Sequence, residues 1–289
     1  MAKGRELRGR IKSIENTRRI TRTMEMVAAS KLKRAQDRVV AARPYAAVLR
    51  DVIADLYSPE LAERFALLRQ PGEVKRAAVI LLTSNRGLAG GFNANLTREA
   101  RGLIATLEGE RTQVDLHVVG RKGLGYFRYI GRAIASSRTD LSDAPTPADA
   151  RQLVDGVMDA FAKRELDAVY VVYAKYQSAL STPPTADRIL PVTPPERKAD
   201  APVRDYILAP SAEAILTELL PAYVRNAVYR SMVETAAAEQ GARRSAMKSA
   251  TDNANDLITT LRRTYNRARQ AQITQEIAEI VGGAAALEG

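Results

Sequence analysis

Two long stretches, one at each end of this 289-residue chain, repeat small or apolar residues at alternating steps of four and three. This spacing places the residues along one side of an α-helix and is typical of a helix that packs lengthwise on another helix. About 150 residues without this repeat separate the two stretches. We therefore predict a long antiparallel two-stranded coiled coil, formed by an N-terminal helix in residues 1–58 and a C-terminal helix in residues 210–286.

The repeat can be followed residue by residue. In the N-terminal stretch its positions are Leu7, Ile11, Ile14, Arg18, Thr21, Glu25, Ala28, Leu32, Ala35, Val39, Ala42, Ala46, Leu49, Ile53 and Leu56. In the C-terminal stretch they are Leu219, Ala222, Asn226, Tyr229, Val233, Ala236, Gln240, Arg243, Met247, Ala250, Ala254, Leu257, Leu261, Thr264, Ala268, Ala271, Gln275 and Ala278. Alanine recurs in both sets. The two backbones can approach closely, and the pair gains its stability from length rather than from large side chains.

The two arms differ in length. If both leave the central region at one level, the C-terminal helix extends past the N-terminal one by nearly twenty residues, or roughly 28 Å at ~1.5 Å per residue. A single helix in water is marginally stable. We expect the unpaired tip, residues 266–281, to be held by a surface outside the chain.

The central region has the pattern of a mostly parallel sheet. Continuous apolar runs alternate with helical segments, which is typical of strands that are covered on both faces. The expected strands are residues 77–83, 114–119 and 168–173, with shorter ones at 132–136 and 187–191. The expected helices are residues 93–107, 121–129 and 147–163, the last capped by Thr146. The fold class is therefore α/β, with a Rossmann-like domain in residues 75–195 joined to the coiled coil.

Proline residues indicate where the long helices bend or end. The first helix should begin near Gly4, bend at Pro44, where a backbone hydrogen bond is lost, and end near residues 58–59. Residues 193–202 are rich in proline and charge, and we expect them to be the connection back to the C-terminal helix.

The positive charge is concentrated at one end. Residues 1–50 hold fourteen Lys or Arg and four Asp or Glu, a net charge of +10, whereas residues 51–200 carry +1 and residues 201–289 carry none. Almost the whole formal charge of +11 thus lies on the first helix. This helix should face an acidic partner, unless it is simply a solvated basic face.

Several function classes are disfavoured. The chain has no cysteine, and its single histidine, His117, lies in an apolar strand pattern where we expect it to be packed. No Ser-His-Asp, Cys-His or metal-ligating set can be assembled from these residues, so we expect neither catalysis by this chain nor a bound cofactor or metal. No apolar run reaches the ~18 residues of a membrane span, and the N-terminus lacks a signal-peptide core.

Two glycine clusters follow the expected strands. Gly87, Gly90 and Gly91 do not match the dinucleotide fingerprint, the cluster at residues 120–125 has reversed spacing, and no phosphate-binding GK[ST] loop exists. Tight turns from strand to helix explain both clusters without a nucleotide.

Three segments together resemble the gamma subunit of F-type ATP synthase. Residues 10–31 read RIKSIENTRRITRTMEMVAASK, residues 86–91 read RGLAGG and are followed by Asn93 and Asn95, and residues 265–276 read YNRARQAQITQE. The similarity extends over essentially the whole chain, and the two helical motifs are highly specific.

The resemblance implies a rotor shaft without catalytic residues of its own. In that family the coiled coil stands inside a ring of alternating alpha and beta subunits, with one gamma per three alpha and three beta. The globular domain lies on the ring of c subunits beside the epsilon subunit. Rotation driven by protons cycles the beta-subunit sites through ATP synthesis. The implied location is the cytoplasmic face of a bacterial inner membrane, as a peripheral protein.

The resemblance also implies partner-binding residues. Arg22, Met24 and Lys31 match the part of the shaft that faces acidic beta-subunit loops. Residues matching the upper contact with a beta-subunit loop are Arg269, Gln270, Thr274 and Glu276. Those matching the part seated on the c-ring and epsilon are Asp205, Tyr206 and Leu208. The alternative is that the polar residues of the two helices are simply solvated positions and that Met24 is an apolar residue flanking the seam.

The chain departs from the family at two positions. Ala209 replaces an acidic residue that is common in relatives, which weakens the case for an electrostatic contact with the ring there. Ala89 replaces a frequent cysteine, and the cysteine-bearing insert of chloroplast forms is missing, so redox control of that kind is not expected.

Two other classes of function remain open. A basic coiled coil could bind nucleic acid through Arg18, Arg19 and Arg22, although aromatic residues for base stacking are absent before Tyr45. A Rossmann-type enzyme would need a dinucleotide that stabilises the central domain.

Overall fold

The structure, a computed structural model, describes residues 2–57, 63–178, 181–193 and 211–288. Its contacts divide the chain into two units. The first, here called the terminal unit, is Met1–Ala28 with Arg243–Gly289, and the second, the α/β unit, is Ala29–Ala242. Two long helices, α1 (Ala2–Leu56) and α6 (Ala212–Glu288), contribute to both units.

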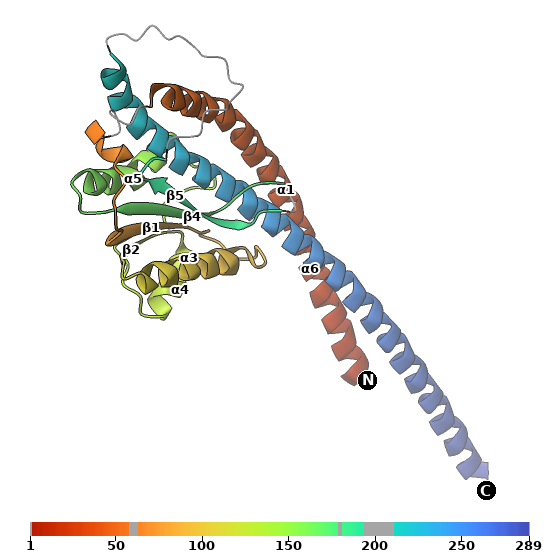
Figure 1. Cartoon of the computed structure of the whole chain (residues 1–289). Coiled ribbons are helices and arrows are strands. Elements are labelled where there is room, and N and C mark those ends of the chain that lie inside the picture. Colours follow the sequence, from red (N-terminus) through yellow and green to blue (C-terminus); the bar gives the residue numbers. More distant parts are fainter. Residues whose placement is uncertain (1, 58–62, 179–180, 194–210, 289) are drawn as a thin grey trace. The chain divides into compact units, whose positions relative to one another are not determined.

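The remaining elements belong to the α/β unit (Figure 1). They are η1 (Ala66–Leu68), β1 (Arg76–Leu82), α3 (Phe92–Gly109), β2 (Gln113–Val119), α4 (Arg121–Tyr129), β3 (Ser136–Arg138), α5 (Pro147–Ala162), β4 (Ala168–Ala174) and β5 (Pro184–Leu190). The predicted alternation of strands and helices is therefore confirmed.

The strands form one sheet in the order β3-β2-β1-β4-β5. β1 pairs in parallel with β2 and β4, β2 pairs in parallel with β3, and β5 is antiparallel to β4. The order reverses at β1, because the chain adds strands first on one side of it and then on the other. This is the Rossmann-like arrangement that the sequence predicts.

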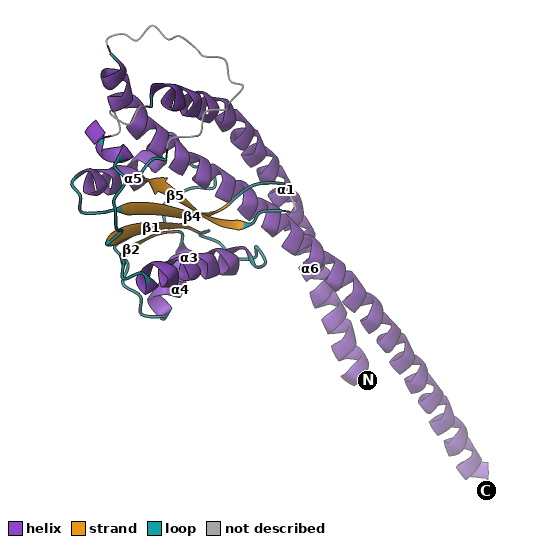
Figure 2. Cartoon of the chain, viewed as in Figure 1, coloured by secondary structure: helices purple, strands orange, loops and turns teal. Residues whose placement is uncertain are grey.

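The sheet is covered on both faces, as Figure 2 shows for the strands in orange. Side chains of β1 alternate between two apolar clusters. Ala78, Ile80 and Leu82 pack with α5, α6 and the end of α1, whereas Ala77, Val79 and Leu81 pack with α3 and α4. Six of the seven residues of β1 are buried, which explains the continuous apolar run in the sequence.

The first part of α6 is a core helix of the α/β unit, whereas the sequence analysis assigned the whole of residues 210–286 to the coiled coil. Leu216, Leu220, Val224, Val228 and Met232 are buried in the cluster on the α5 face of the sheet. Further along, Val233 and Ala237 pack against Ala35 and Val39 of α1. Within this unit α6 is therefore buried on more than one side, so a single heptad repeat does not describe its contacts.

In the terminal unit, α1 and α6 run antiparallel. From one contacting pair to the next, the residue number falls in α1 and rises in α6. Thr21 lies 2.8 Å from Thr251 (Oγ1 to Oγ1), and Arg18 donates to Asn255 Oδ1 at 3.1 Å. Further out, Arg262 donates to Glu15 at 2.7 Å and Arg8 donates to the Tyr265 hydroxyl at 2.6 Å. The predicted orientation of the coiled coil is confirmed.

The predicted register of α6 is wrong at alternate positions in this unit. Thr251 and Ile258 are buried where the sequence analysis placed Ala250 and Leu257, and Leu257 is 53% exposed. Likewise Tyr265 and Gln272 are more buried than Thr264 and Ala271. Hydropathy cannot separate two adjacent apolar residues, and it penalises Thr251. That hydroxyl is buried because it also donates to the carbonyl of Met247.

The predicted strand at residues 132–136 is also displaced, because β3 begins only at Ser136. The preceding residues end α4 instead. Gly131 has a φ of 73°, and the amide of Arg132 donates to the carbonyl of Phe127. Sheet pairing starts after this helix end. The predicted edge strand at 187–191 is present as β5, which begins three residues earlier and ends at Leu190.

Two predictions about helix geometry can be checked directly. Thr146 caps α5 through a capping box with Asp149, as its sequence indicates. α1 remains helical through Pro44, and Figure 1 shows it curving within the α/β unit.

Across the described segments, no helix combines the length and apolar character needed to cross a bilayer.

Candidate partner-binding surface

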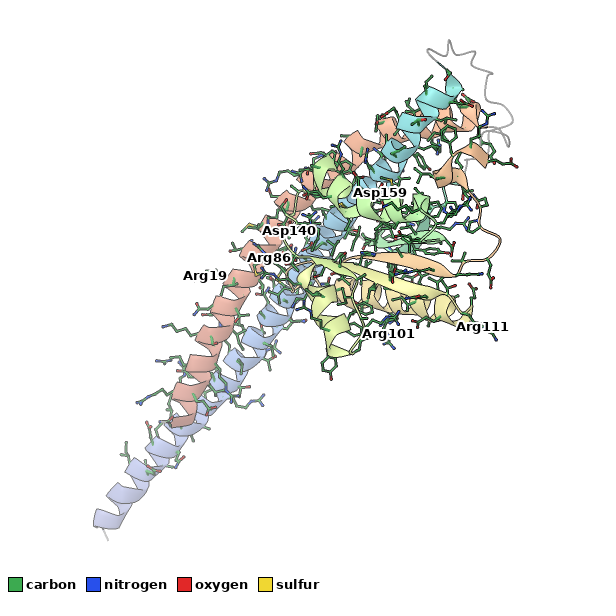
Figure 3. The ribbon with its side chains drawn as sticks, turned by 90° about the vertical axis from the view of Figure 1, so that its left-hand side faces the viewer. Arg19, Arg86, Arg101, Arg111, Asp140 and Asp159 are labelled. Carbon is green, nitrogen blue, oxygen red and sulfur yellow. The ribbon has the colours of Figure 1, made fainter. Side chains whose placement is uncertain are left out.

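The α1 surface of the terminal unit is strongly basic. Its residues 1–28 hold eight Lys or Arg and three Asp or Glu, so this short segment alone carries +5. Arg8, Arg10 and Arg18 have partners in the chain, whereas the described contacts of Arg19 and Arg22 include no acidic group. Figure 3 shows Arg19 on the side of α1 that is turned away from α6. An acidic partner could therefore reach these guanidinium groups.

The three contact residues predicted on α1 lie in different environments. Arg22 is exposed, and Met24 is half-buried beside the seam. Lys31 belongs to the α/β unit, where its ammonium lies 2.5 Å from Asp143 Oδ2. An intrachain carboxylate is thus one partner of Lys31. No local sequence pattern indicates this contact, because Asp143 is 112 residues away.

Apolar side chains are also exposed on this helix. Ile20 and Val27 lie seven residues apart and are 59% and 51% exposed, and Met26 is exposed to the same degree as Ile20. Sequence analysis missed them because it followed only the seam. Their seven-residue spacing off that seam was the available signal, and it places Ile20 and Val27 on one side of α1.

The tip of α6 has no covering among the described residues. From Ile273 to Gly283 every side chain is exposed, including Ile273, Ile277, Ile280 and Val281. Such a row of branched apolar residues normally packs against something. The predicted unpaired tip, residues 266–281, is thus a mostly exposed helix in which only Ala268 and Gln272 are half-buried.

The predicted contact residues of the tip all project from this exposed helix. Arg269 and Gln270 are exposed, and Thr274 is exposed with its hydroxyl bonded to the carbonyl of Gln270. Glu276 accepts a hydrogen bond of 2.8 Å from Gln272 one turn earlier. Contacts within one helix of this kind leave the polar groups available to a partner, because each residue keeps further donors or acceptors.

The third predicted set, Asp205, Tyr206 and Leu208, lies outside the described residues. Its assignment to the c-ring and epsilon contact therefore stays a prediction.

The glycine turn after β2 has a structural explanation. Gly120 has a φ of 95°, and a Cβ there would lie 2.2 Å from the carbonyl oxygen of Thr83. A Cβ on Gly123 would lie 2.8 Å from the Thr83 hydroxyl oxygen, which accepts a hydrogen bond from the Gly123 amide. These glycines let α4 approach the end of β1, as the prediction of a tight turn requires.

His117 is half-buried in β2, where Nδ1 lies 2.7 Å from the Ser136 hydroxyl. Burial lowers the pKa of the imidazole below its ordinary value, and the nearby Asp115 only partly opposes this. No group of His, Asp or Glu suited to hold a metal ion occurs among the described residues.

Comparison with known proteins identifies the family. A family profile described as ATP synthase matches residues 3–287. The ATP synthase gamma chain of Gemmatimonas aurantiaca is 65% identical over 290 residues, with all of both chains covered. The gamma chain of Frankia casuarinae is 46% identical, with 98% of this chain and 97% of the relative covered.

Solved structures share the fold. The central stalk and c-ring structure of the Tetrahymena thermophila mitochondrial ATP synthase includes a chain with a TM-score of 0.63 and 24% identity, covering 80% of this chain and 99% of that one. A chain of the Euglena gracilis mitochondrial ATP synthase has a TM-score of 0.67 and 19% identity, covering 99% and 95%. At these identities the structures support the architecture, while the sequence matches settle membership: the chain belongs to the ATP synthase gamma chain family.

Proposed function

We propose that this chain is the central rotor shaft of an F-type ATP synthase, which couples rotation of the c-ring to the conformational cycle of the beta-subunit catalytic sites. The chain contributes no catalytic group of its own. Its role is mechanical, and the long antiparallel helices of the terminal unit are suited to transmit torque.

The observation that carries the proposal is the exposed end of α6. Ile273, Ile277 and Ile280 lie on a helix that no other described residue covers. An isolated helix of this kind frays in water. A surrounding sleeve of alpha and beta subunits would bury these side chains and still allow the helix to turn, because apolar contacts are not directional.

The basic surface supports the same assignment. Arg19 and Arg22 project from α1 without an acidic partner in the described chain, and the beta subunit would supply acidic loops facing them. Met24 would lie beside this contact. In the tip, Arg269 and Gln270 would hold a beta-subunit loop, with Thr274 and Glu276 completing the polar surface.

The other end of the shaft is assigned from the family alone. Asp205, Tyr206 and Leu208 would contact the c-ring and the epsilon subunit, and the complex would hold one gamma for three alpha and three beta subunits. The chain would then be a peripheral protein on the cytoplasmic face of the bacterial inner membrane. The functional parts would be residues 1–58 and 210–286 as shaft and 75–195 as base.

Reconstitution tests the assignment. The purified chain, mixed with alpha and beta subunits of the same enzyme, should form an ATP-hydrolysing complex with one gamma per three alpha–beta pairs, measured by native mass spectrometry. Failure to assemble, or tight salt-sensitive binding to nucleic acid in its place, would contradict the rotor assignment and favour the basic nucleic-acid binder.

A further inference from the structure

A second cluster of basic side chains lies in the α/β unit and includes Lys31, one of the contact residues predicted above. It lines a cavity of about 730 Å³. Its basic lining residues come from three places in the fold: α1, the loop after β1, and the first residue of α4. They are Lys31, Arg34, Arg38, Arg86 and Arg121. The cavity lies where β1 and β2 end, which is the edge of a parallel sheet at which α/β proteins hold ligands.

Four of these cations lack an acidic partner among the described residues. Lys31 is paired with Asp143, but no ion pair is formed by the guanidinium groups of Arg34, Arg38, Arg86 or Arg121 in the described chain. Arg34 and Arg38 are four residues apart and share one side of α1. Like charges around one cavity raise its positive potential, since the low-dielectric walls focus the field.

The carboxylates at this cavity are already neutralised. Asp140 is held by Arg138 through two hydrogen bonds of 3.1 and 2.5 Å, and this contact lowers the pKa of the Asp140 carboxyl. Asp143 accepts the bond from Lys31. The lining as a whole holds five cations and two carboxylates, a net charge of +3. Figure 3 shows Arg86 and Asp140 close together beside α1.

Hydrogen bonds within the fold occupy the first backbone amides of α4 at this cavity. The side chain of Asn85 donates to the carbonyl of Leu141 at 3.0 Å and accepts from the Arg121 amide at 3.1 Å. The amides of Lys122 and Gly123 bond to Ser84 and Thr83. The first amides of α4 are thus satisfied inside the fold, so a ligand would be held by arginine side chains.

We propose that this arginine-lined cavity binds a compact multivalent anion of the phosphate class, such as inorganic pyrophosphate. Guanidinium groups match phosphate oxygens with paired hydrogen bonds, and four arginines line this one cavity. No aromatic residue occurs among the lining residues, so a nucleobase would find nothing to stack on. Only Leu141 and Ala144 are apolar, which disfavours a peptide whose side chains need apolar pockets.

The test is a calorimetric titration of the full-length chain with inorganic pyrophosphate at constant ionic strength, with sulfate and a short polyglutamate peptide as comparison ligands. The double variant Arg34→Gln/Arg86→Gln should weaken pyrophosphate binding by at least about tenfold, because each charge-assisted bond to an anion contributes strongly. The control Arg98→Gln/Arg101→Gln removes the same charge from α3. Figure 3 shows Arg101 away from Arg86, and this control should change Kd by less than about threefold.

Three results would overturn the proposal. They are the absence of saturable pyrophosphate binding to the unaltered chain, an equal loss in both double variants, and binding of the peptide without binding of pyrophosphate. Thermal unfolding of each variant checks the fold. If the glutamine variant is unstable, Arg34→Lys/Arg86→Lys keeps the charge but removes the guanidinium fork. It should still weaken binding severalfold at an unchanged unfolding temperature.

Discussion

The two units of this chain are stabilised in different ways. The α/β unit buries large side chains on both faces of a sheet, among them Phe161, Ile80 and Leu190. The buried positions of the terminal unit are mostly small or polar, such as Thr21, Ala28, Thr251 and Ala254. Since apolar stabilisation scales at ~25 cal/mol per Å² of area removed from water, the terminal unit gains less from each residue. A core of the first kind supports itself, whereas a pair of helices of the second kind benefits from a surrounding partner.

The largest effect should follow from emptying the core of the α/β unit. Phe161 is fully buried in α5, with the guanidinium carbon of Arg69 5.0 Å from the centre of its ring. Phe161→Ala should lower the free energy of unfolding by about 3–5 kcal/mol, measured by denaturant titration. Tyr129→Ala, at a position 89% exposed, is the control and should cost less than about 0.5 kcal/mol. Similar losses would show that this core does not support the unit.

A smaller and local effect is expected in the terminal unit. Ile258 is buried in α6, and Ile258→Ala should cost about 2–3 kcal/mol. The loss should appear in hydrogen exchange of residues 4–28 and 243–272, with little change in β1. Leu257→Ala, one residue earlier and 53% exposed, should have almost no effect. Equal effects of the two variants would contradict the observed register.

The tip can be probed by charge and by length. In the assembled complex, Arg269→Gln should slow ATP hydrolysis by up to about tenfold if the guanidinium bonds to a beta-subunit loop. Removing the residues after Ile277 should slow it less, because apolar contacts of a sleeve tolerate shortening. Hydrolysis rates ranked in the opposite order would show that the apolar end, and not Arg269, makes the main contact.

On the basic face of α1, an added positive charge should change the coupling of proton pumping to ATP hydrolysis at Met24 but not at Met26. Met24→Lys adds a cation beside the proposed acidic loops, an interaction on the order of 1 kcal/mol near a surface. We expect a lower ratio of proton pumping to ATP hydrolysis, measured in membrane vesicles. Met26→Lys, at a residue 59% exposed, is the matched control. Unchanged coupling in both variants would remove Met24 from the contact.

The smallest effect concerns pH and the α/β unit. Burial lowers the pKa of His117 below its ordinary value near 6.5, so below that pH the unfolded chain binds a proton that the folded chain resists. Stability should therefore decrease as the pH falls through and below 6.5. His117→Gln should reduce this dependence by less than about 1 kcal/mol, seen in thermal unfolding at pH 5 and pH 8. A steeper dependence in the variant would contradict the sign of the shift.

Sequence periodicity predicted most of the architecture, because buried strands and helix caps have local signatures. The run at β1 and the Thr146 cap are examples. Periodicity did not predict burial or strand ends that depend on contacts with residues distant in the chain. Thr251 is buried beside Thr21, which is 230 residues earlier in the chain and shares a hydrogen bond with it. Similarly, β3 begins late because Gly131 and Arg132 complete the end of α4.

The candidate surfaces show the same limit. The basic character of α1 and the unpaired end of α6 follow from residue counts and helix lengths alone. The pairing of Lys31 with Asp143 depends on the topology of the sheet, which brings the loop after β3 to α1. The same topology places Arg86 after β1 and Arg121 after β2 in one cavity with Arg34. No local pattern could indicate these contacts.

Both long helices contain a proline, Pro44 in α1 and Pro221 in α6. Each removes the amide that would bond to the carbonyl four residues earlier, at Val40 and Thr217. Both of those residues are exposed, so water can satisfy the carbonyls at little cost. The two helices thus each have a point of low bending stiffness within the α/β unit. Under load, bending of either helix would concentrate at these points, and the buried neighbours Leu220 and Val224 would limit it in α6.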